Sequence, residues 1–119
     1  MAKAIPDAIL DAMLNASEGT HIAICSSEPA NYAAIAAATL AGQAISGTIT
    51  AAAGDTNGRK NTYPAQTGIS ISVSGTATHV VTHNNSTTMY IVTTCTSQAL
   101  TNGGTVDTNA FDHELADPT

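Results

Sequence analysis

The stretch "GISISVSG", residues 68–75, has the clearest two-residue period in the chain. Ile69, Ile71 and Val73 alternate there with three serines. Successive side chains of a strand point to opposite faces, so this alternation predicts a β-strand with one apolar and one polar face. Such a strand needs neighbours to pair its backbone and to cover its apolar face. The segment therefore predicts a β-sheet protein.

Further strand-like segments lie on both sides of it and are separated by turns rich in Gly and Asn. In chain order, these candidate strands are residues 20–27, 44–53, 76–83, 87–97 and 105–115. The alanine-rich segment 31–44 is ambiguous, and we interpret it as a short helical turn or a loop. The six or seven short strands predict a mainly β fold, an antiparallel β-sandwich or small barrel.

One helix is expected before these strands, over residues 5–17, "IPDAILDAMLNAS". Its apolar side chains recur at steps of four, as in Ile9 and Met13, and Gly19 follows its end. A helix this short is only marginally stable on its own in water. We therefore expect Ile9 and Met13 to pack against protein, either the chain's own sheet or a neighbouring subunit.

The length of 119 residues predicts one domain, residues 1–119, with a helical segment over 1–19 and a β domain over 20–119. The chain has no Trp and a single Phe, Phe111, so its core must consist of small aliphatic side chains. Such side chains bury little apolar area each. We therefore expect part of the stability to come from burial in an assembly.

Charged residues are sparse, with three basic and nine acidic side chains and a net charge of -6. A nucleic-acid-binding surface needs clustered Lys and Arg, so this composition argues against one. Acidic residues interrupt the apolar start, which argues against a secretory signal, and no apolar run is long enough to predict a membrane span. Cys25 and Cys95 are expected to be free thiols, although a disulfide between them stays open.

Two of the three basic residues, Arg59 and Lys60, are adjacent in "AGDTNGRKNTYPA", residues 53–65. A phosphate-binding P-loop needs four residues between its glycines and a helix after them. Here three residues separate Gly54 from Gly58, and a proline follows shortly afterwards. The segment therefore predicts a turn rich in Gly and Asn that presents a basic pair.

His79 and His83 have the four-residue spacing that places two metal ligands on one face of a helix. Their Val and Thr neighbours favour a strand instead, where four residues span about 13 Å. One zinc ion cannot bind both imidazoles across that distance. We therefore expect neither a metal nor any other cofactor.

The segment "FDHEL", residues 111–115, places Asp112 and Glu114 on one face of a predicted strand. No Gly-x-Ser-x-Gly nucleophile elbow accompanies these side chains, so we expect no enzyme activity. An acidic edge of this kind is usually a solvated surface. Alternatively, it could meet Arg59 and Lys60 of a neighbouring copy or of another partner.

Four segments together carry a resemblance: "ICSSEPANY" (24–32), "GDTNGRKNTYPA" (54–65), "SGTATHVVTH" (74–83) and "AFDHELADP" (110–118). They resemble a group of small virion structural proteins encoded by tailed bacteriophages and prophages, and the likeness extends over most of the chain. Val80 and Val81 depart from that pattern, because the proteins that the chain resembles carry bulkier residues there.

This resemblance implies a capsid decoration or cement protein that binds the major capsid protein shell. It would be made in the host cytoplasm and would act on the virion surface as a homo-oligomer, most simply a trimer. A tail, neck or fibre component is the alternative, as is a carbohydrate-binding fibre module. A sugar site would need aromatic platforms, for which the tyrosines are Tyr32, Tyr63 and Tyr90.

Overall fold

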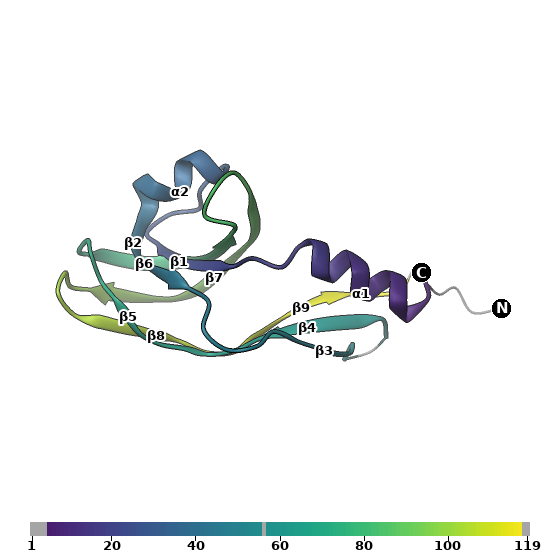
Figure 1. The fold of residues 1–119 in the computed structure, drawn as a ribbon. Coiled ribbons are helices and arrows are strands. Elements are labelled where there is room, and N and C mark those ends of the chain that lie inside the picture. The colour runs from purple at the N-terminus through teal and green to yellow at the C-terminus, as the bar shows by residue number, and fades with distance from the viewer. Residues whose placement is uncertain (1–4, 56, 118–119) are drawn as a thin grey trace. The chain divides into compact units, whose positions relative to one another are not determined.

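A computed structural model of the chain describes residues 5–55 and 57–117 (Figure 1). The elements are α1 (Asp7–Ala16), β1 (His21–Cys25), α2 (Tyr32–Ala38), β2 (Thr39–Ala44), β3 (Thr50–Ala53), β4 (Arg59–Tyr63), β5 (Gln66–Ser70), β6 (Gly75–His83), β7 (Met89–Leu100), β8 (Thr105–Thr108) and β9 (Phe111–Leu115). The predicted fold is confirmed: it is mainly β, its strand pairs are antiparallel, and it is consistent with a small sandwich.

The contacts within the chain form two compact units, which we describe separately. The sheet unit consists of Gly19–Ile45 and Gln66–Thr108. The helix unit consists, among the described residues, of 5–18, 46–65 and 109–117. The prediction of a single domain with a boundary after residue 19 stays a prediction.

The sheet unit contains a four-stranded sheet in the order β2-β1-β6-β7 and a two-stranded sheet of β5 and β8. A bridge between Ala41 and Ile71 connects the two sheets, and the backbone N–H groups of Ser72 and Val73 donate to the carbonyl of Leu40. The core beneath α2 combines Ile35 and Ala38 of the helix with Ala23, Cys25 and Val81 of β1 and β6. Figure 1 shows α2 over this sheet.

The helix unit pairs β3, β4 and β9 in a three-stranded antiparallel sheet against which α1 packs. Leu10 and Leu14 are the buried residues of α1. Tyr63 and Phe111, opposite each other in the β4–β9 register, stack with ring centroids 4.8 Å apart. These contacts explain how a helix of ten residues is held in place, since isolated helices of this length are marginal.

The turn before β4 requires a glycine at position 58. Gly58 has φ +75°, and a Cβ atom there would lie 2.0 Å from the carbonyl oxygen of Leu115. Its carbonyl accepts a hydrogen bond from the N–H of Gly54, which closes the turn. The predicted Gly-rich turn is therefore present, but it ends before the basic pair.

Two predicted strands are shorter in the structure. Segment 68–75 is a strand only up to Ser70, in β5, with a single bridge at Ile71, and Val73 is half-exposed rather than on the buried face. Of segment 44–53, only Thr50–Ala53 forms a new strand, β3.

Three further predicted elements differ from the structure. Arg59 and Lys60 are the first two residues of strand β4 rather than part of the turn. The strand sequence "RKNTY" is polar, so it has no apolar alternation from which a strand could be predicted. The predicted strand 105–115 is two strands, β8 and β9, which belong to different sheets. Segment 31–44 is a helix followed directly by a strand, because Asn31 caps α2 and the chain turns extended at Thr39.

Candidate functional sites

Arg59 is held within its own chain by the N-terminal helix. Its Nε donates a hydrogen bond of 2.9 Å to a carboxylate oxygen of Asp11 in α1. The two side chains are 21% and 31% exposed, so the pair lies at the edge of the helix unit. The bond to Asp11 raises the pKa of the Arg59 guanidinium above its usual value. This contact links α1 to the first residue of β4.

Lys60 is held by two carboxylates. Its Nζ donates to Asp55 at 2.7 Å and to Asp112 at 3.0 Å, and these bonds raise the pKa of Lys60. Asp112 also accepts a hydrogen bond of 2.8 Å from the hydroxyl of Thr62, and the bonds from Thr62 and Lys60 lower the pKa of its carboxyl. Glu114 accepts from the backbone N–H of Asp55 at 2.5 Å.

The acidic strand β9 and the basic start of β4 therefore meet inside one chain. Their register places Lys60 opposite Glu114 and Thr62 opposite Asp112. The interface role predicted for Arg59, Lys60, Asp112 and Glu114 stays a prediction. A partner's carboxylate would have to replace, or add to, the bonds that these residues make in the structure.

The two apolar residues predicted at an interface are on the surface of α1. Ile9 is 53% exposed and Met13 is 47% exposed, whereas Leu10 and Leu14 are buried. The single apolar stripe expected from the sequence is therefore split, and only the leucine pair covers the unit's own core. Ile9 and Met13 remain available for contact with another molecule.

The sheet unit almost lacks charge. Of the Asp, Glu, Lys and Arg residues, only Glu28 and Asp107 lie in it. Its longest strand, β7, has 12 residues and contains no charged residue and no proline. β7 pairs with β6 on one side, and no described strand pairs with its other side. Residues 93–94 and 96–99 of this strand are exposed.

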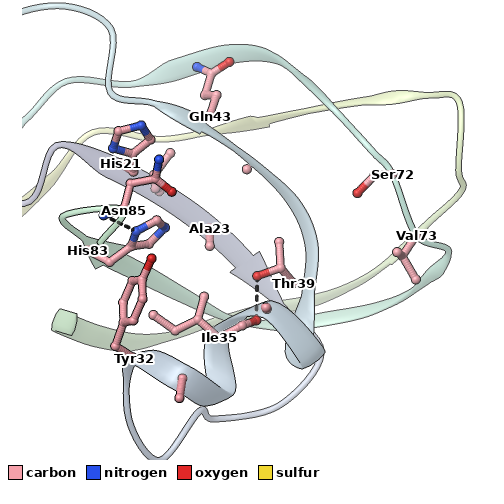
Figure 2. A pocket seen from close by; sticks show the side chains of 14 residues that line it. His21, Ala23, Tyr32, Ile35, Thr39, Gln43, Ser72, Val73, His83 and Asn85 are labelled. Carbon is pink, nitrogen blue, oxygen red and sulfur yellow. Dashed lines mark hydrogen bonds between the residues drawn. The ribbon is translucent and has the colours of Figure 1, made fainter. Parts of the chain in front are cut away.

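A pocket of about 530 Å³ lies in the same unit, between α2 and the ends of β1, β2 and β6 (Figure 2). Two histidines form part of its wall. His21 and His83 are opposite each other in the β1–β6 register, and their rings stack with centroids 5.6 Å apart. Tyr32 of α2 meets His83 edge-on at 5.8 Å. No local pattern in the sequence indicates this pocket, because its residues meet only through the strand pairing.

His83 is held in one orientation by the turn that follows it. The side-chain oxygen of Asn84 accepts three backbone N–H bonds of 2.8–2.9 Å, which closes this turn. Asn85 has φ 58°, and its N–H donates 2.9 Å to Nδ1 of His83. Burial, and then the neighbouring His21, lower the pKa of His83.

The remaining sequence candidates lie on strands. His79 and His83 belong to β6, so the predicted strand setting is confirmed. Among residues 5–55 and 57–117, no three His, Cys, Asp or Glu side chains group as metal ligands. Cys25 and Cys95 are both thiols, and burial raises the pKa of each. No helix in the described part of the chain is long and apolar enough to cross a membrane.

The chain matches no protein-family model, no curated protein and no solved structure.

Proposed function

We propose that this chain is a structural protein of a bacteriophage particle, a capsid decoration or cement protein that binds the major capsid protein shell. The observation that carries this proposal is the long, uncharged edge of β7, with which no strand in the described part of the chain pairs, in a unit with two charged residues, Glu28 and Asp107. The resemblance of four segments to small phage virion proteins supports the same role.

Edge strands expose unpaired N–H and C=O groups that can pair with another chain. Proteins that remain free in solution usually protect such edges with Lys, Pro or a very short strand. β7 has none of these three protections over its 12 residues, and the bulges that can also protect an edge are limited to two register shifts in its pairing with β6. A surface of this kind is suited to being covered by protein, as it would be in a shell of many copies.

Charge supports the same reading. Charged residues make up about 25% of a typical globular chain, whereas the sheet unit carries only two of them. Weak contacts repeated over many copies act together through multivalency, so no single contact has to be strong. We propose a homo-oligomer, with a trimer favoured, and the virion surface as its location. Ile9 and Met13 offer a second apolar contact on α1.

The test is the number of copies in a purified particle, measured by quantitative mass spectrometry and located in an electron-microscopy map. Copies distributed over the whole shell would support the decoration role. A small ring of copies at the neck, tail or fibre would favour that alternative instead. Complete absence from the particle would contradict both.

A further inference from the structure

The pocket beside α2 is lined by uncharged side chains and by two histidines. None of its lining residues is Asp, Glu, Lys or Arg, and all of them belong to the sheet unit. Binding of a phosphate or carboxylate ligand usually relies on Arg, Lys or a helix N-terminus, and binding of a hard cation relies on carboxylates. Tyr32 and Ala33 at the N-terminus of α2 also line the pocket, but this helix has only seven residues and its Ala34 N–H is bound by Asn31. The lining therefore favours a neutral ligand.

His83 supplies a fixed donor to this pocket. The backbone N–H of Asn85 can only donate, so Nδ1 of His83 must accept, and the ring proton must lie on Nε2. His83 is 8% exposed, and its Nε2 has no hydrogen-bond partner among the described residues. In Figure 2 this second ring nitrogen faces the pocket interior. Nε2 is not among the buried polar atoms that lack a partner, so it opens onto the pocket, where a ligand oxygen can accept its hydrogen bond in place of solvent.

Aromatic and apolar side chains form the rest of the wall. Gln43 also borders the pocket, but the strand register places its side chain on the opposite face of the sheet from His83, where its amide nitrogen donates 3.1 Å to Gln66. Tyr32 and Ile35 of α2 and the half-exposed Val73 add aromatic and apolar surface to the lining. Tyr63, by contrast, is buried in the helix unit, and Tyr90 lies outside the pocket on β7.

A neutral sugar matches these three properties. Its hydroxyl groups both donate and accept hydrogen bonds, its C–H face packs against aromatic and aliphatic side chains, and it carries no charge. The volume of about 530 Å³ is within the usual range of small-ligand pockets. We propose that this pocket binds a neutral mono- or disaccharide unit, with an oxygen of the sugar on Nε2 of His83 and its apolar face against Tyr32. This inference does not depend on where the chain sits in a particle.

The experiment is a titration of the purified full chain with glucose, galactose, N-acetylglucosamine and maltose, followed by NMR chemical shifts. We expect saturable binding of at least one sugar with a dissociation constant of about 1–10 mM, and shifts concentrated around His83 and Tyr32. Lack of saturable binding of all four sugars up to about 50 mM would overturn the proposal.

Two variants test the location. Tyr32→Ala removes the aromatic wall, and Val73→Arg obstructs the pocket from a side chain that is 50% exposed, so at least one should keep the fold. Each folded variant should weaken binding about tenfold. Tyr90→Ala, the matched control outside the pocket, should leave binding unchanged. Binding that is insensitive to the pocket variants, or equally weakened by Tyr90→Ala, would refute this site.

Discussion

The backbone N–H of Asn85 donates a hydrogen bond of 2.9 Å to Nδ1 of His83, and this bond requires the neutral imidazole. Protonation of His83 would put a hydrogen on Nδ1 and break the bond. It would also place a cation against His21, whose ring stacks on His83. The residues that face His83 from the packed elements are His21 of β1 and Tyr32 of α2, and neither is a carboxylate.

The first prediction is a loss of stability in mild acid. The pKa of His83 is lowered in the folded state relative to 6.5, so the unfolded chain binds a proton more readily. The contribution of neutral His83 is complete above pH 6.5 and is lost as the pH falls through the lower folded pKa. Denaturant unfolding between pH 8 and 5 should show this decrease.

The control for this prediction is His83→Gln, which keeps an acceptor near the Asn85 N–H but does not titrate in this range. Its stability should depend less on pH over the same interval, with His21 still present. An equal pH dependence in both proteins would exclude His83 as the cause.

The second prediction concerns the link between Arg59 and Asp11. Arg59→Ala removes the hydrogen bond that connects α1 to β4, whereas Lys60→Ala leaves that bond intact. We expect faster amide hydrogen exchange throughout α1 in Arg59→Ala only. High salt should raise the exchange rates of α1 in the parent protein only slightly. Salt screens exposed charge pairs, but Arg59 Nε also donates a directed hydrogen bond to Asp11.

The role of Arg59 and Lys60 between subunits can be separated from that internal link. If they also bind a partner, both variants should lose binding to bare capsid shells at low salt. Asp11→Asn, which weakens the internal pair without removing a cation, should retain that binding. Unchanged shell binding by both alanine variants would show that the basic pair only stabilises its own chain.

Several parts of this fold could be predicted from the sequence because local patterns determined them. Residues 21–25 and 75–83 alternate or cluster β-branched side chains between clear turns, and they form β1 and β6. Residues 5–17 predicted α1, where Leu10 and Leu14 cover the core. In each case the residues contributing to the pattern are close in sequence.

The rest depended on contacts between distant residues. Strand β4 is polar and is stabilised by pairing with β3 and β9, so its own residues gave no period. Lys60 was predicted to lie in a turn, and no local pattern could indicate that Asp112, 52 residues further along the chain, binds it. The pocket arises because strand pairing brings His21 and His83 together, which no local spacing could indicate.

The third prediction compares two neighbouring residues of α1. Leu14 is fully buried, so Leu14→Ala should lower the free energy of unfolding by about 2–5 kcal/mol. Met13 is 47% exposed, so Met13→Asp should change it by only about 0.5 kcal/mol. If Met13 is covered in an assembly, the same Asp would weaken oligomerisation, because it buries an unpaired charge there. Sedimentation velocity measures the oligomeric state of both variants. Full oligomerisation of Met13→Asp would show that Met13 does not lie in the interface.

The last prediction concerns the edge of β7 with which no described strand pairs. Thr94 and Ser97 are exposed on this strand, and a lysine at either position introduces the charge that protects edge strands from pairing. Because the side chain points away from the unit's own core, Thr94→Lys and Ser97→Lys should unfold like the parent protein. Both should lose oligomerisation or binding to bare shells, since pairing would bury an unmatched ammonium group.

Thr48→Lys, an exposed position outside the strands, is the matched control and should assemble normally. Sedimentation velocity and co-sedimentation with shells distinguish the cases. Normal assembly of both β7 variants would show that this edge is not an interface, and the proposed decoration role would then have to depend on another surface, such as Ile9 and Met13.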